Sequence, residues 1–162
     1  MPSRILPPDG ISVRRWRHPA RFSRLRGMGK ADGNPMNIFV AEDAPEIRKR
    51  IIAMVRTVAG INVIGEAESV SEAIDGVLGS ATDALLLDLQ LKDGMGLEVL
   101  ARVKQARPEL HVIVLTNFAI PQYRQASLSA GAEFCLDKSR EFGLVPGILR
   151  SWLEAAGDRP VA

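Results

Sequence analysis

The sequence has little or nothing of three features that identify other classes of protein. Its single cysteine, Cys135, excludes an internal disulfide framework and favours a reducing compartment. No apolar run approaches the roughly 18 residues that a membrane span needs. The pattern of a phosphate-binding P-loop is also absent, so Gly94 and Gly96 are expected to shape a turn and not a phosphate loop. We therefore expect a soluble, cytoplasmic protein with no P-loop.

Charge is unevenly distributed along the 162 residues, whose formal net charge is +2. Residues 1–36 hold seven arginines and one lysine against two aspartates, and they also contain five prolines and four glycines. This stretch shows no sustained helical or strand period, so we expect a basic, disordered N-terminal extension. Two alternatives exist for this stretch: it binds nucleic acid, or natural translation begins at Met36 and the stretch is not made. The remaining residues are net acidic, so the basic character belongs to the extension. A length of 162 residues favours one folded domain, which we expect over 37–157, followed by a short tail over 158–162.

The most informative stretch of the sequence runs from Asp83 to Leu100. Residues Ala84 to Leu87 are all apolar and end at Asp88, and a glycine-containing turn and a helical apolar pattern follow. A short run that is apolar at every position is typical of a strand covered on both faces, as in a parallel sheet. Asp88 would then lie at the carboxyl edge of that sheet, where open α/β sheets bind their ligands.

Similar patterns repeat on both sides of this stretch. Apolar runs predict further strands at 38–41, 61–67, 112–115 and 134–136, and helical spacing predicts a helix after every strand. Ser69 begins a capping-box pattern before the second helix. The last helix is expected over about 141–156, with a buried face made of Leu144, Val145, Ile148, Leu149, Trp152 and Leu153. Five alternating strands and helices predict an α/β fold with a doubly wound parallel sheet and right-handed crossovers.

Functional side chains stand at the ends of four of the predicted strands: Glu42, Asp43, Asp88, Thr116 and Lys138. If the strands are parallel neighbours, these side chains gather at one edge of the sheet. Three neighbouring carboxylates repel unless a cation compensates, and hard oxygen ligands favour Mg²⁺. A hydroxyl and an ammonium group facing such a site suit phosphoryl oxygens. The set predicts phosphoryl transfer with an aspartate nucleophile.

This arrangement resembles the receiver domain of two-component response regulators. The segments that carry the resemblance are V-A-E-D at 40–43, L-L-L-D-L-Q-L-K-D-G-M-G at 85–96, V-I-V-L-T-N at 112–117 and A-G-A-E-F-C-L-D-K-S at 130–139. Each segment is weak evidence alone, but their order and spacing together are specific. The resemblance covers about residues 37–156 and implies a flavodoxin-like strand order of 2-1-3-4-5.

The resemblance also implies a role for each candidate residue. Asp88 would accept a phosphoryl group from a phosphohistidine on a sensor histidine kinase or a histidine phosphotransfer protein. Glu42, Asp43 and Asp88 would hold Mg²⁺ together with the backbone carbonyl of Gln90, while Thr116 and Lys138 would bind phosphoryl oxygens. Phosphorylation would change binding to an unknown downstream protein. We expect a stand-alone receiver that catalyses only its own phosphotransfer and dephosphorylation, contacts no membrane, and binds DNA at most through the basic extension.

Three positions depart from the usual receiver pattern. Cys135 stands where many receivers have a switching aromatic residue, Asn117 replaces a very small residue beside Thr116, and Ser139 replaces a frequent proline. Two other functions stay open at this point. One is a phosphohydrolase of the haloacid-dehalogenase type, although Gln90 stands where that family has a second aspartate. The other is an unphosphorylated interaction module with a nucleic-acid-binding arm.

Overall fold

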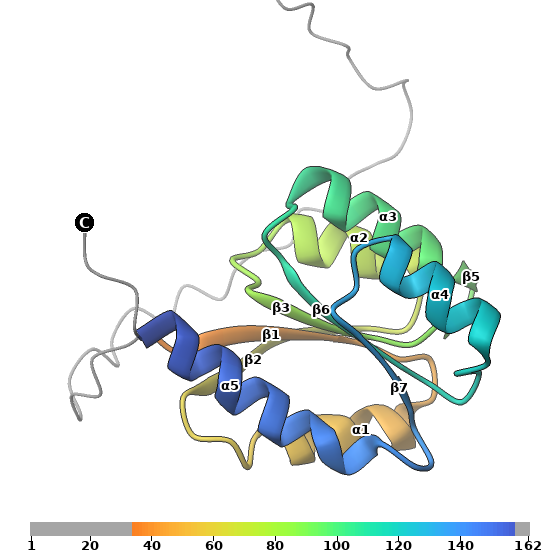
Figure 1. The fold of residues 1–162 in the computed structure, drawn as a ribbon. Helices are drawn as coiled ribbons and strands as arrows, with labels where there is room; N and C mark the ends of the chain where they lie inside the picture. Colours follow the sequence, from red (N-terminus) through yellow and green to blue (C-terminus); the bar gives the residue numbers. More distant parts are fainter. Residues whose placement is uncertain (1–33, 158–162) are drawn as a thin grey trace, which may run out of the picture. The chain divides into compact units, whose positions relative to one another are not determined.

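The computed structural model describes residues 34–157, which form a five-stranded sheet with helices on both faces (Figure 1). Most of the predicted N-terminal extension and the whole predicted tail lie outside these residues. No helix within 34–157 has the length and apolar character needed to cross a membrane. The elements are β1 (Met36–Ala41), α1 (Pro45–Val55), β2 (Ile61–Ala67), α2 (Val70–Leu78), β3 (Ala84–Leu87), β4 (Gln90–Leu91), β5 (Gly94–Met95), α3 (Gly96–Ala106), β6 (His111–Thr116), α4 (Pro121–Ser129), β7 (Phe134–Asp137), the 3₁₀ turn η1 (Phe142–Leu144) and α5 (Val145–Gly157).

The strand order in the sheet is β2-β1-β3-β6-β7, and every neighbouring pair is parallel. This confirms the predicted order 2-1-3-4-5, because β4 and β5 form a separate two-stranded hairpin. Helices α1 and α5 cover one face of the sheet, while α2, α3 and α4 lie on the other (Figure 1). The order changes direction between β1 and β3, which lie next to each other at the switch point.

Strand β3 is the centre of the core, and all four of its residues are buried. Leu85 and Leu87 pack with the cluster under α2 and α3, whereas Ala84 and Leu86 pack with the cluster under α1 and α5. The apolar run at 84–87 is thus explained by burial on both faces, as predicted.

The ring of Phe39 on β1 fills the space between β2 and α2. A β-carbon added at Gly65 would lie 2.4 Å from the ring, and one added at Gly76 would lie 2.5 Å from it. The pairing of β1 with β2 passes from Ile38–Val63 to Phe39–Gly65, so the irregularity brings a glycine opposite the aromatic ring. The two glycines therefore make room for one large core side chain.

Local signals stand at the ends of α2 and α1, and the predicted capping box at Ser69 is confirmed. The hydroxyl of Ser69 accepts a hydrogen bond from the amide of Glu72 at 3.2 Å, as a capping residue should. Pro45 occupies the first turn of α1, and Gly60, after that helix, has a φ of +86°, a backbone conformation that favours glycine.

Two predictions about local structure were wrong. The last α-helix begins at Val145 rather than near 141, because Pro146 has no amide hydrogen and fits only the first turn, so the 3₁₀ turn η1 precedes it. Leu144 consequently lies outside the helix and is 54% exposed instead of buried. The β4–β5 hairpin was not predicted, because its strands of two residues each are too short to show a period.

We predict that Gly65→Ala lowers the free energy of unfolding by about 1–3 kcal/mol, because the added methyl group overpacks the ring of Phe39. Urea unfolding measures this loss. In a Phe39→Leu background the same substitution should cost much less, since the smaller side chain leaves room for the methyl group. Equal losses in both backgrounds would contradict the packing described here.

Candidate functional site

Three carboxylates meet at the carboxyl edge of the sheet. Glu42 and Asp43 follow β1, and Asp88 follows β3, the strand beside it. One oxygen atom from each of the three side chains lies within 4.8 Å of the others. Glu42 and Asp88 are buried, whereas Asp43 is exposed. The predicted acidic cluster is therefore present, and it opens to solvent through Asp43.

The ammonium group of Lys138 bridges the two buried carboxylates of this cluster. Its Nζ lies 2.8 Å from Oδ2 of Asp88 and also donates a hydrogen bond to Oε2 of Glu42. The lysine side chain is only 9% exposed, so the bridge is largely shielded from water. Lys138 follows β7 at the end of the sheet, and 96 positions separate it from Glu42 in the sequence.

The pKa of Glu42 is raised from 4.5 to about 7, and burial is the largest cause. The hydrogen bond and the charge of Lys138 oppose this rise, and the negative charge of Asp88 adds to it. Two carboxylates thus share one ammonium group, and the second negative charge is poorly compensated. The site favours either a proton on Glu42 or an added cation.

Thr116 reaches the same edge at the end of β6. Its side chain is fully buried, and its hydroxyl oxygen accepts a hydrogen bond from the amide of Phe118 at 3.1 Å. Its backbone carbonyl accepts a hydrogen bond from the amide of Lys138 at 3.0 Å. The structure therefore places Thr116 beside Lys138, the other residue expected to bind phosphoryl oxygens.

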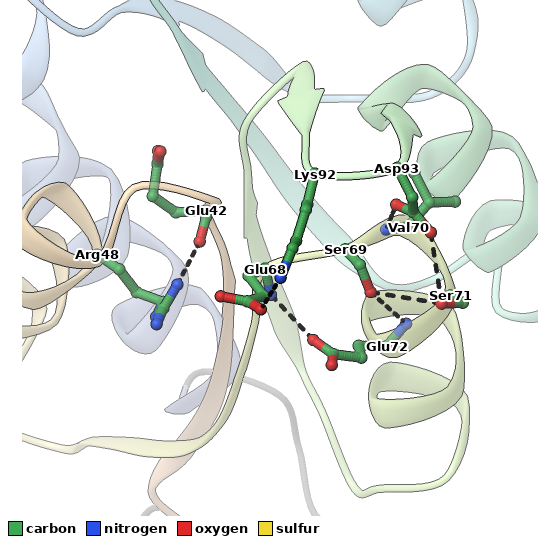
Figure 2. Close-up of polar contacts among 9 residues, drawn as sticks. All are labelled: Glu42, Arg48, Glu68, Ser69, Val70, Ser71, Glu72, Lys92 and Asp93. Carbon is green, nitrogen blue, oxygen red and sulfur yellow. Dashed lines mark hydrogen bonds and ion pairs between the residues drawn. The ribbon is translucent and has the colours of Figure 1, made fainter.

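The turn between β1 and α1 is held by contacts that the sequence analysis did not identify. The amide of Ala44 donates to Oε1 of Glu42 at 3.2 Å, which orients that carboxylate. Arg48 donates from Nη1 to the backbone carbonyl of Glu42 at 2.6 Å (Figure 2). A side chain that binds a backbone carbonyl leaves no pattern in the sequence, so Arg48 could be found only from coordinates.

The β4–β5 hairpin is attached to the loop that precedes α2 (Figure 2). Lys92 forms an ion pair with Glu68 at 2.9 Å, and the backbone amide of Lys92 donates to the carbonyl of Glu68 at 3.0 Å. Asp93 accepts a hydrogen bond from the amide of Val70 at 2.5 Å, which caps the start of α2 from a distant part of the chain. These contacts fix the segment that immediately follows Asp88.

Gly96 lets the hairpin return close to the backbone of Asp88. A β-carbon at this position would lie 2.1 Å from the carbonyl oxygen of Asp88. The amide of Gly96 donates to the carbonyl of Leu89 at 2.8 Å, and the amide of Gln90 donates to Oδ1 of Asp88 at 3.2 Å. The role predicted for the carbonyl of Gln90 as a metal ligand stays a prediction.

The three unusual positions have distinct surroundings. Cys135 is buried in the core cluster under α2 and α3, and burial raises the pKa of its thiol. Asn117 is exposed next to Thr116. The amide and hydroxyl groups of Ser139 both donate to Oδ1 of Asp137, which shapes the loop after β7. Phe134, the aromatic residue directly before Cys135, is 37% exposed.

The fold and this site define a class of protein: a doubly wound parallel sheet with an acidic cluster, a lysine and a threonine at its switch point. The family model for the response regulator receiver domain matches residues 38–145. The chain belongs to this family.

Relatives and solved structures agree with this assignment. The DNA-binding transcriptional activator DevR/DosR of Mycobacterium tuberculosis is 28% identical over 97 residues, which are 60% of this chain and 45% of that protein. The probable transcriptional regulatory protein TcrX of the same organism is 30% identical over 130 residues, which are 80% of this chain and 55% of the relative. This chain thus spans about half the length of these two relatives.

One similar solved structure is the isolated receiver domain of RcsB from Salmonella enterica serovar Typhimurium, obtained in the presence of the phosphomimetic BeF₃⁻. It is 26% identical, has a TM-score of 0.69, and the match covers 78% of this chain and 94% of that chain.

The raised pKa of Glu42 predicts a specific dependence of stability on pH. The folded state holds a proton on Glu42 up to about pH 7, whereas the unfolded chain loses it near 4.5, so stability falls as pH rises between these values. In Glu42→Gln this fall should disappear, and above pH 7 the variant should be more stable than the wild type by about 2–4 kcal/mol. Urea unfolding in EDTA at pH 5 to 8 measures both effects. Parallel pH profiles would contradict the assignment.

We predict that Gly96→Ala lowers the free energy of unfolding by about 3 kcal/mol, because the backbone of Asp88 cannot move away as a flexible side chain can. The matched control is Gly147→Ala in α5, where an added β-carbon meets nothing within 4 Å and helix propensity improves. Urea unfolding of the two variants compares them. If Gly96→Ala is as stable as the control, the close approach of the hairpin to Asp88 is wrong.

Proposed function

We propose that this receiver domain accepts a phosphoryl group on Asp88 from a phosphohistidine of a sensor histidine kinase or a histidine phosphotransfer protein. The observation that carries the proposal is the contact of Lys138 with both Asp88 and Glu42 at the edge of the sheet. Asp88 is the carboxylate on the central strand, and its Oδ1 and Oδ2 are oriented by the amide of Gln90 and by the ammonium group of Lys138.

In the proposed reaction a carboxylate oxygen of Asp88 attacks the phosphorus atom of the donor. The bond between phosphorus and the imidazole nitrogen breaks, its electron pair stays on that nitrogen, and the nitrogen takes up a proton. The product is an acyl phosphate on Asp88. Lys138 and the hydroxyl of Thr116 move to bind phosphoryl oxygens, so the negative charge of the transferred group is met by a cation and a hydrogen-bond donor.

The carboxylates of Glu42, Asp43 and Asp88 fit a divalent cation such as Mg²⁺. Their oxygens lie within 4.8 Å of one another, and burial leaves Glu42 with a raised pKa that a cation would lower. When bound, Mg²⁺ supplies positive charge that offsets the carboxylates and the incoming phosphoryl group. Glu42 has to be ionised to serve as a ligand, so cation binding releases protons below about pH 7.

Phosphorylation would then act as a switch. Contacts of Lys138 and Thr116 with the phosphoryl group favour one conformation of their loops and so change binding to a downstream protein.

The two relatives described above carry names of transcription regulators and are about twice as long, so a DNA-binding output elsewhere in a longer protein is a second candidate. The predictions of a stand-alone receiver and of a cytoplasmic location stay predictions, as does DNA binding by the basic extension. The mass of the native protein tests the prediction of a stand-alone receiver, since a longer protein would have a larger mass.

A phosphohydrolase of the haloacid-dehalogenase type is less well supported. Such an enzyme would need a second aspartate to protonate its leaving group, and Gln90 at that position cannot donate a proton from a carboxyl group. Repeated turnover of a phosphomonoester would favour this alternative over a receiver.

We predict that acetyl phosphate with Mg²⁺ adds one phosphoryl group to the wild type and none to Asp88→Asn, because the amide is a poor nucleophile. The matched control is Asp75→Asn on the exposed side of α2, which should be phosphorylated like the wild type. Intact-protein mass spectrometry counts the groups, and hydroxylamine should remove them as it does from acyl phosphates. A wild type that never gains the group, or an Asp88→Asn variant that gains it equally, would refute the proposal.

A further inference from the structure

Arg124, in the first turn of α4, makes three hydrogen bonds to acceptors outside its helix. Its Nε donates to the carbonyl of Ala119 at 3.2 Å, its Nη1 to the carbonyl of Cys135, and its Nη2 to the carboxylate of Glu141 at 2.8 Å. One rigid guanidinium group thus connects the loop before α4, strand β7 and the loop after β7. A lysine, which carries a single point charge, does not provide this planar set of donors.

These acceptors lie close in sequence to the two residues proposed to bind phosphoryl oxygens. Ala119 comes three positions after Thr116, and Glu141 comes three positions after Lys138. The carboxylate of Glu141 also accepts from the amide of Asp137 at 2.8 Å, and the amide of Glu141 donates to the carbonyl of Asp137 at 2.7 Å. The guanidinium group is therefore bonded to both loops that carry the phosphoryl-binding side chains.

The ion pair between Arg124 and Glu141 alone contributes little to stability. The side chains of Arg124 and Glu141 are 36% and 32% exposed, and water screens the attraction between charges that accessible. Helix α4 has a single buried residue, Ser127, so apolar packing holds it only weakly. Its position relative to β7 then depends strongly on polar contacts, of which Arg124 makes three.

We infer that Arg124 is a positioning residue that couples the phosphoryl-binding ends of β6 and β7 to helix α4. Movement of Thr116 and Lys138 toward a phosphoryl group displaces the loops bonded to the guanidinium group, and the displacement reaches α4 through it. The side chain of Cys135 is buried in the core, and its backbone carbonyl takes part in the coupling. This inference rests on the proposed phosphoryl site.

The test compares binding of beryllofluoride with binding of Mg²⁺ alone, both by calorimetry. Arg124→Gln should weaken beryllofluoride binding in the presence of Mg²⁺ about tenfold, because Thr116 and Lys138 are no longer held in place. Affinity for Mg²⁺ alone should change less than about twofold, since Arg124 contacts none of the carboxylates proposed as its ligands. Arg150→Gln on α5, which makes the same change of charge at an exposed position, should match the wild type in both measurements.

Hydrogen exchange provides a second readout that a purely structural role would not change. In the wild type, beryllofluoride should alter amide exchange in residues 121–129, and in Arg124→Gln this response should be lost. Arg124→Lys should restore little of it. Glu141→Gln should weaken beryllofluoride binding in the same direction, and combining it with Arg124→Gln should add little, because both act through one contact. If Arg124→Gln does not fold, Arg124→Lys and Glu141→Gln provide the test.

The outcomes separate the two claims. If the wild type binds beryllofluoride and the Arg124 variants match it in affinity and in exchange over α4, the coupling is refuted while the receiver function stands. A wild type that binds no beryllofluoride refutes the phosphoryl site and the coupling together. A parallel loss of affinity for Mg²⁺ alone would show that Arg124 supports the whole edge of the sheet, which also contradicts the inference.

Discussion

The candidate site depends on one buried ammonium group that two carboxylates share. Lys138 satisfies Asp88 at 2.8 Å and also Glu42, yet it carries only one positive charge. Burying this unequal set costs free energy, and the raised pKa of Glu42 reflects that cost. This excess of negative charge gains stability from a ligand that supplies a cation. A bound cation would in turn leave the ammonium group of Lys138 free to contact an anionic phosphoryl group, which the carboxylates alone would repel.

The sheet makes this arrangement possible because its parallel strands all end at one edge. Strands β1, β3 and β6 and the adjacent β7 bring residues from distant parts of the sequence to within bonding distance. Strand β3 is buried on both faces, so Asp88 follows a strand that is held by core packing on each side. Tight local features then adjust it: Gly96 permits the close return of the hairpin, and the contacts of Lys92 and Asp93 hold that hairpin in place.

The sequence predicted the alternating strands and helices, and the side chains that meet at one edge of the sheet, because both leave local patterns. The strand order was implied by the family resemblance. The fully apolar run at 84–87 indicates a strand covered on both faces. Polar residues at the ends of successive strands meet at one edge when those strands are parallel. The remaining features come from tertiary contacts without periodicity. Arg48 and Arg124 bind backbone carbonyls, the hairpin strands have two residues each, and Pro146 delays the last helix by a few positions. The exposure of Leu144 follows from that delay.

The central claim is that Lys138 leaves its shared position when Asp88 carries a phosphoryl group. A crystal structure with Mg²⁺ and beryllofluoride tests it most directly. We expect the beryllium adduct on Asp88, the ammonium group of Lys138 and the hydroxyl of Thr116 in contact with fluorine atoms, and the metal ion held by Glu42, Asp43 and Asp88. An adduct on another residue, or a Lys138 that still bridges Asp88 and Glu42 beside a bound adduct, would contradict the account.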